Sequence, residues 1–135
     1  MGDNLAPPLL GNVIGDLEGN ILIAEWTDEG GNPDSPQYIA PIHLHHTEDE
    51  AWYVLEGELG ILMGEESVRV PAGSCVVVPK GTRHTYWNAR AEPARYLLIM
   101  GPKTKALIDQ IHARRRNWDE MKALFNEYEA ELLGD

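Results

Sequence analysis

Cysteine is nearly absent from this sequence: Cys75 is the only one among 135 residues. A single thiol cannot form an intramolecular disulfide, so such cross-links are excluded as a source of stability, and a reducing, cytoplasmic compartment is expected. Cys75 precedes three consecutive valines, a setting that is more typical of a buried thiol than of a nucleophile. We therefore expect Cys75 to be buried and unreactive.

Positive charge and long apolar runs are also scarce. The chain has 11 Lys and Arg against 22 Asp and Glu, a formal net charge of −11. Nucleic acids and anionic membrane surfaces both need a basic face, so this balance disfavours them as partners. The apolar runs fall well short of the roughly 18–20 residues of a spanning helix, and no signal-peptide pattern is expected at the N-terminus.

Short stretches of strand type fill most of the chain instead. β-branched and aromatic residues gather in segments separated by Gly, Pro, Asn and Asp, which favour turns. The length suits one domain with a single core. Many short strands with turns between them predict an antiparallel sandwich or barrel. The expected strands are 20–27, 38–45, 51–55, 59–63, 67–70, 75–78, 83–88 and 95–100.

The pattern changes to helix near the C-terminus. Residues 103–113 carry apolar side chains that share a helical face. Asn117 followed by Glu120 is typical of a capping box that begins a second helix, which Gly134 is expected to end. The apolar residues of this second helix recur at three- and four-residue steps; they are Trp118, Met121, Leu124, Phe125, Tyr128 and Leu132.

These patterns divide the chain into three expected parts. They are an irregular segment over residues 1–11, a β-barrel over 12–101 and a helical extension over 102–135. An apolar face of the barrel, together with the amphipathic second helix bearing Trp118 and Phe125, makes a homodimer the expected assembly.

Two stretches concentrate residues that bind metals. His43 and His45 lie two apart in an expected strand, so their side chains point to the same face. Glu50 follows at an odd interval, and the corner at residues 47–49 is expected to return it to that face. With His84 from the second stretch, three imidazoles and one carboxylate suit a divalent first-row transition metal: Fe, Ni, Mn, Cu or Zn.

The spacing of these residues resembles the paired motifs of the cupin superfamily. The first motif reads His-x-His-x4-Glu-x6-Gly from His43 to Gly57. The second reads Gly-x5-Pro-x-Gly-x2-His-x3-Asn from Gly73 to Asn88. One position departs from the pattern, since Gln37 stands where the first motif usually opens with glycine, a residue needed for backbone geometry rather than for ligation.

This resemblance covers residues 38–100 and implies an all-β jelly roll, also called a double-stranded β-helix, with a metal held inside. The chain further resembles small single-domain cupins related to quercetin-type dioxygenases, which implies a metal-dependent dioxygenase acting on a small organic substrate. The superfamily also contains isomerases, epimerases, decarboxylases, lyases and non-catalytic binding proteins. A non-redox isomerase or lyase, and a binding protein without turnover, therefore remain alternatives.

Two residues have expected catalytic roles. Glu50 could act as a general base besides binding the metal, and the Tyr86 hydroxyl could donate a hydrogen bond to the substrate. Alternation along the strand places the Trp52 side chain on the same face as Glu50. Trp52 is expected either to line the cavity or to pack in the core, and Trp26 could line the cavity as well.

The other polar residues near the motifs are expected to be structural. His46 should point outward, and Asn88 should bind backbone groups near the mouth. Glu48 and Asp49 are expected to form a solvated corner rather than to support the site. Lys80 and Arg83 are expected to be solvated at the surface rather than to attract an anionic substrate. The basic residues 114–116 are expected to provide charge at a helix C-terminus or to form part of an interface.

Overall fold

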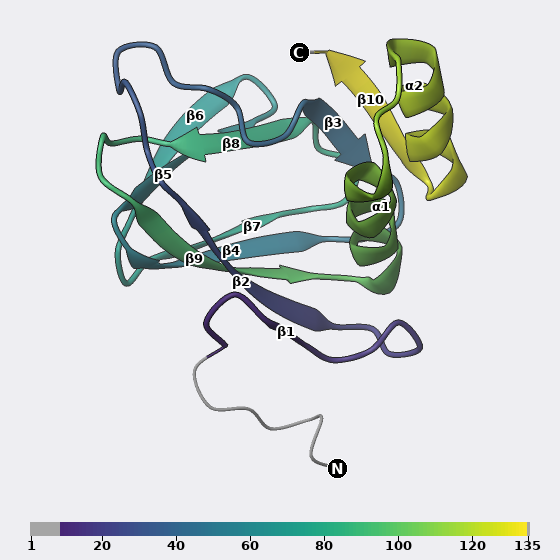
Figure 1. The fold of residues 1–135 in the computed structure, drawn as a ribbon, viewed down its shortest axis with the longest axis horizontal. Coiled ribbons are helices and arrows are strands. Elements are labelled where there is room, and N and C mark those ends of the chain that lie inside the picture. Colours follow the sequence, from purple (N-terminus) through teal and green to yellow (C-terminus); the bar gives the residue numbers. More distant parts are fainter. Residues whose placement is uncertain (1–8, 135) are drawn as a thin grey trace.

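The computed structural model describes residues 9–134. Two five-stranded antiparallel sheets face each other, and two helices lie at one end of the sandwich (Figure 1). In spatial order, the first sheet contains β1 (Val13–Ile14), β2 (Leu22–Asp28), β9 (Ala94–Met100), β4 (Glu50–Glu56) and β7 (Cys75–Val78). The second contains β10 (Ala130–Gly134), β3 (Ile42–His45), β8 (His84–Asn88), β5 (Glu58–Met63) and β6 (Glu66–Pro71).

The expected all-β jelly roll is confirmed. Most sheet neighbours are distant in sequence, as in the β2-β9-β4-β7 order, so the chain passes repeatedly between the two sheets. Alternation decides which side chains face inward: in β9, every second residue from Ala94 to Met100 is buried. The inner faces form one core, whose largest members include Trp52, Leu59, Ile61, Tyr86, Tyr96 and Leu98.

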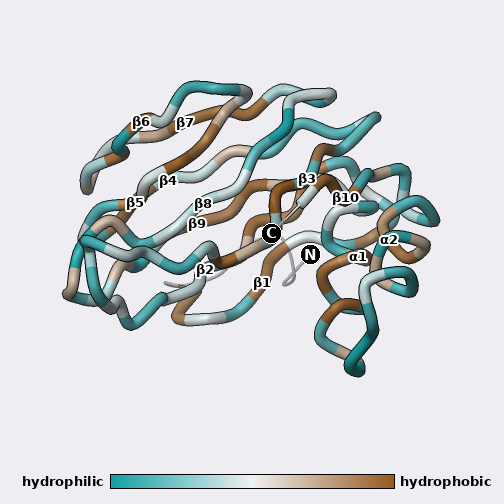
Figure 2. Tube along the Cα trace, turned by 90° about the horizontal axis from the view of Figure 1, so that it is seen from above, coloured by the Kyte–Doolittle hydropathy of each residue, from teal (hydrophilic) through white to brown (hydrophobic). Residues whose placement is uncertain are grey.

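The helices are α1 (Pro102–Ala113) and α2 (Trp118–Glu127). The expected capping box is present, because the Asn117 side chain accepts from the Glu120 amide while the Glu120 carboxylate accepts from the Asn117 amide. Seen from above, both helices lie beside β3 and β10 (Figure 2). A second apolar cluster joins helices and strand through Leu107, Leu124, Phe125, Ala130 and Leu132. No helix of the described residues has the length and apolar character needed to cross a membrane.

The expected extension of the second helix to Gly134 is wrong. The helix ends at Glu127, and Glu129 adopts a left-handed backbone conformation with φ of 57°, which stops further helical turns. The chain then forms β10, which pairs with β3 and places Leu132 opposite His43. Ala130 and Leu132 are two residues apart and both buried, so the free edge of β3 selects a strand where local periodicity favours a helix.

The expected burial of Cys75 is also wrong, because its thiol is exposed. β7 is the edge strand of the first sheet, and its side chains alternate between the two faces. Val78 is buried in the core, and Val76 packs against it, so Cys75 and Val77 face outward. Three consecutive valines do not reveal which of two opposite faces the preceding residue occupies.

Candidate metal centre

Three strands bring the four expected ligands together. His43 and His45 are on β3, while Glu50 and His84 begin β4 and β8, respectively. His43 and His84 are directly opposite each other in the antiparallel pairing of β3 with β8. One nitrogen or oxygen atom from each of the four buried side chains lies within 4.8 Å of all the others. The grouping predicted from the sequence is therefore present.

The corner between β3 and β4 places Glu50 on the same face as the histidines. The Asp49 carboxylate accepts a hydrogen bond of 2.8 Å from the Lys80 amide, and the Gly81 amide donates to the His45 carbonyl at 2.6 Å. These bonds attach the β3–β4 corner to the turn that precedes β8. Asp49 is exposed, as expected, but its hydrogen bond holds the two motif segments in place.

Backbone carbonyls orient two of the imidazoles. His43 Nδ1 lies 2.6 Å from the Pro41 carbonyl oxygen, and His84 Nδ1 lies 2.9 Å from that of Thr82. A carbonyl can only accept, so each Nδ1 carries a proton, and in the neutral form of each ring Nε2 keeps its lone pair. Metal-binding histidines are commonly fixed by an outer acceptor of this kind. Both rings are thus prepared to bind a cation through Nε2.

The arrangement around Glu50 also fits a cation. Glu50 Oε1 lies 2.8 Å from His45 Nε2 and 3.0 Å from His84 Nε2. His45 Nε2 is buried, yet despite this short distance no hydrogen bond of acceptable geometry satisfies it. An unsatisfied buried nitrogen is costly, and a shared cation would satisfy it together with the carboxylate. The residues present therefore fit a divalent transition metal.

The pKa values of the cluster reflect burial and close contact. Burial raises the pKa of Glu50, but its contacts with His45 and His84 outweigh this effect and hold it well below the usual range. Burial, together with the neighbouring His84 and His45, lowers the pKa of His43 to about 4. For His84, burial lowers the pKa, but the Glu50 carboxylate more than reverses this, and the net shift is upward.

Glu48 and Thr104 connect the cluster to α1. The Glu48 carboxylate accepts from the amides of Lys103 and Thr104 at 3.0 and 2.8 Å, and from the Thr104 hydroxyl at 2.8 Å. The Thr104 hydroxyl in turn lies 3.5 Å from His45 Nδ1, a long hydrogen-bond contact. A Cβ at Gly101 would clash with Glu48, so glycine permits this close approach.

The expectation that Glu48 is merely solvated is therefore wrong. Its carboxylate caps the N-terminus of a helix that begins more than fifty residues later in the chain. The sequence motifs gave no indication of Thr104, because it lies outside them. Only the packing of α1 on the end of the sandwich brings it near His45.

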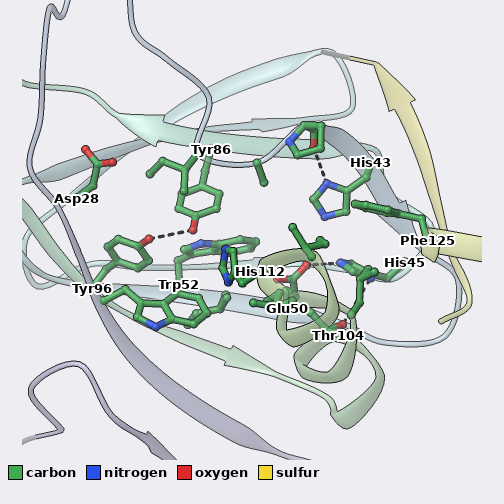
Figure 3. A pocket seen from close by; sticks show the side chains of 18 of the residues that line it. Asp28, His43, His45, Glu50, Trp52, Tyr86, Tyr96, Thr104, His112 and Phe125 are labelled. Atoms are coloured by element: carbon green, nitrogen blue, oxygen red, sulfur yellow. Dashed lines mark hydrogen bonds and ion pairs between the residues drawn. The ribbon is translucent and has the colours of Figure 1, made fainter. Parts of the chain in front are cut away.

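A cavity of about 350 Å³ adjoins the cluster. His43, His45 and Glu50 form part of its wall, together with Trp52 and Tyr86 (Figure 3). Trp26 lines it as well. Trp52 also packs in the core, so both of the roles that strand alternation left open for it apply. Sequence reasoning missed Tyr96 and the helical part of the wall. Residues from α1 and α2 complete the lining: Thr104, Leu107, Ile108, Ile111, His112 and Phe125. The Phe125 ring lies 5.5 Å from the His43 ring, centroid to centroid.

The basic residues of the described chain lie outside the cavity lining, whose charged groups are Asp28 and Glu50 besides the histidines. Lys80 is exposed, as expected, whereas Arg83 is half-buried and donates to the Gly64 carbonyl at 2.6 Å rather than being simply solvated. His46 is exposed, as expected. Asn88 binds backbone groups, also as expected, because its side chain donates to the carbonyls of Asp28 and Glu92. The expected charge at a helix end is present at Arg116, which donates to a carbonyl near the end of α1.

Known proteins share this architecture. Residues 35–100 match the cupin domain family. An uncharacterised protein from Streptomyces coelicolor is 29% identical over 85 residues, which cover 63% of this chain and 73% of the relative.

Two solved structures illustrate the likeness. A provisionally named sugar phosphate isomerase from Acidithiobacillus ferrooxidans is 27% identical with a TM-score of 0.53, over 62% of this chain and 51% of the other. The match thus spans about half the length of that protein. A predicted oxalate decarboxylase from Thermotoga maritima is 22% identical with a TM-score of 0.51, over 59% and 64% of the two chains. The matched segment, the facing antiparallel sheets and the buried His and Glu cluster identify residues 35–100 as a cupin domain.

Proposed function

We propose that this protein is a metal-dependent enzyme of dioxygenase type that acts on a small, uncharged organic molecule. The observation that carries the proposal is the position of the His and Glu cluster in the wall of a cavity of about 350 Å³. Most of that wall is aromatic or aliphatic, and the volume suits a small organic ligand. His43, His45, Glu50 and His84 would hold the metal.

A bound divalent metal would supply Lewis-acid activation of a substrate oxygen and, if it is Fe, Ni, Cu or Mn, redox chemistry with O₂. Glu50 is ionised in its contacts with His45 and His84, where its lowered pKa makes it only a weak base toward a substrate hydroxyl. If the carboxylate moves away from those histidines, burial raises its pKa and makes it a stronger base. Tyr86, whose pKa burial raises well above its usual value, stays protonated and can donate to the substrate.

The charge of the cavity argues against anionic substrates. Sugar phosphates and oxalate carry negative charge, and sites for such anions usually contain Arg or Lys. The lining residues of the described chain include neither, while Asp28 adds negative charge. A neutral molecule with oxygen atoms that can bind a metal, such as a flavonol, a diketone or a catechol, fits this wall better.

Oxygen consumption tests this proposal. Protein loaded separately with Fe(II), Ni, Cu or Mn should consume O₂ with at least one member of a panel of flavonols, diketones and catechols. His84→Ala should bind little metal and consume none, while its circular dichroism remains that of a folded β-protein, because the core is apolar. Absence of uptake across the panel would contradict the proposal. Turnover without O₂ by zinc-loaded protein would instead favour the isomerase or lyase alternative.

Metal affinity should fall as the pH is lowered. The metal needs the Nε2 lone pair of His84, and the Glu50 carboxylate raises the pKa of this imidazole, so protons compete there first. Below that pKa, affinity should fall about tenfold per pH unit. His43, with a pKa of about 4, should stay neutral through most of this range. Calorimetric titration with zinc between pH 8 and pH 5 measures the effect, and a constant affinity would refute it.

The Thr104 hydroxyl should strengthen metal binding through His45. Thr104→Val keeps the side-chain shape but removes the acceptor near His45 Nδ1, so we expect affinity to fall about tenfold. Thr104→Ser keeps the hydroxyl and should stay near the wild-type value. Chelator competition measures both variants, and equal affinities for Val and Ser would show that the contact has no role in metal binding.

We also propose that the protein is a homodimer that uses the outer face of the first sheet. Ile23, Ile99, Ala51 and Val77 are directly opposite one another across four strands and form an apolar row on that face. Val77 is 57% exposed. Ile23, Ala51 and Ile99 are half-buried. A contiguous row of partly exposed apolar side chains favours association. Phe125, which was expected to contribute, is buried within its own chain and takes no part.

Light scattering coupled to size-exclusion chromatography tests the assembly. Val77→Lys places a charge in the apolar row and should convert a dimer into a monomer. Leu133→Lys, at an exposed apolar position on β10 of the other sheet, is the matched control and should remain dimeric. A wild-type protein that is monomeric at high micromolar concentration would rule out the homodimer.

A further inference from the structure

A cluster of hydrogen-bond donors forms the wall of the cavity away from His43 and His45. The Tyr86 and Tyr96 hydroxyls are 2.9 Å apart, and their rings are nearly perpendicular (Figure 3). The Trp52 ring lies 5.3 Å from the Tyr86 ring and 5.9 Å from the His84 ring, so it stands between the metal-ligand cluster and the tyrosines. All three side chains are buried, and all three line the cavity.

This cluster has more hydrogens to donate than it has acceptors. The Trp52 indole and the two hydroxyls carry three polar hydrogens, and the only acceptors among them are the two hydroxyl oxygens. The bond between the tyrosines uses one hydrogen. Trp52 Nε1 has no hydrogen-bond partner among the described residues. Even if the indole turned to donate to a tyrosine oxygen, one hydroxyl hydrogen would still lack an acceptor.

Within residues 9–134, neither tyrosine hydroxyl has a hydrogen-bond partner other than the hydroxyl of the other tyrosine. Asp28 lines the same part of the cavity, but its Oδ1 accepts from the Gly30 amide at 2.9 Å, and it forms no hydrogen bond with Tyr96. Burial raises the pKa of Tyr96 to about 12, so its hydroxyl keeps its proton at neutral pH. A buried donor without an acceptor is costly, and a ligand that supplies one would gain affinity.

We propose that the tyrosine pair, with Trp52 beside it, donates a hydrogen bond to a neutral carbonyl or ether oxygen on the part of the substrate that lies away from the metal. This inference rests on the proposed function and narrows its substrate class. The acceptor is neutral, because no Lys or Arg of the described chain lines the cavity and Asp28 disfavours an anion there. The substrate therefore carries oxygen at both ends: donors for the metal at one end and a carbonyl or ether oxygen at the other.

Binding of two matched catechols tests this inference. The probes are 3,4-dihydroxyacetophenone, which has a carbonyl oxygen remote from its hydroxyls, and 4-ethylcatechol, which has a similar shape without that oxygen. Zinc-loaded protein prevents redox turnover, and calorimetry gives both affinities. The ketone also binds metals differently from the ethyl compound, so the informative quantity is the change in the affinity ratio between wild type and variant.

The variant is Tyr86→Phe combined with Tyr96→Phe, which removes both hydroxyls and keeps both rings. Removing both partners of a hydrogen bond together is nearly neutral for stability, so this variant should fold. Its preference for the ketone should be about fivefold weaker than that of wild type. Tyr53→Phe, at an exposed position on the outer face, is the matched control and should keep the wild-type ratio.

Infrared spectroscopy provides a second measurement on the wild-type protein. The carbonyl stretch of bound, isotope-labelled ketone should shift to lower frequency than in the double variant. An affinity ratio and a stretch that are the same in both proteins would overturn the inference. Zinc content, determined on the same samples, shows which of the two proposals has failed. If zinc is bound but the affinity ratio is unchanged, only the proposed hydrogen bond from the tyrosine pair is refuted. If no zinc is bound, the proposed metal site is refuted as well.

Discussion

The site depends on an ionised carboxylate that is held away from water. Glu50 is 5% exposed, and its close polar side-chain partners among the described residues are the imidazoles of His45 and His84, which stabilise its charge in place of solvent. Isolated buried charges are very costly in protein interiors, and neutral imidazoles compensate such a charge only in part. A cation shared by the four side chains would balance it. The need to compensate the charge of Glu50 explains why other polar side chains surround it in an otherwise apolar core.

The β-strands and the helices contribute differently to the site. The strands fix where the ligand atoms are, because antiparallel register sets His43 opposite His84 and each side chain projects from a pleated backbone. The helices decide what surrounds those atoms. Through Glu48 and Thr104, the N-terminus of α1 is attached to the corner that orients Glu50, and Phe125 of α2 packs against His43. Substrate selectivity in this protein is therefore expected to depend on the helices as much as on the motifs.

The same cavity explains why family membership leaves the reaction open. One fold can carry many functions, because the residues that line its site determine which molecule can enter. Here the wall combines aromatic rings, an acidic residue and a pair of tyrosine hydroxyls, and its described part has no basic side chain. These features favour a neutral, oxygen-bearing substrate over the anions named for the structural relatives.

The sequence by itself identified the four side chains that cluster and nearly all of the strands. Spacing of two residues places His43 and His45 on one face, a local relation that a strand preserves in any fold. His84 lies in a distant segment and was identified by the resemblance of the second motif to that of cupins. The Asn117 capping box was likewise predictable, since all its atoms belong to one turn.

Relations between distant segments were decided only by the tertiary structure. The free edge of β3 turned residues 130–134 into a strand, the two faces of β7 exposed Cys75, and the packing of α1 brought Thr104 to His45. In each case the outcome depends on which surface or backbone edge lies nearby in space, and a local pattern of hydrophobic and polar residues does not contain that information.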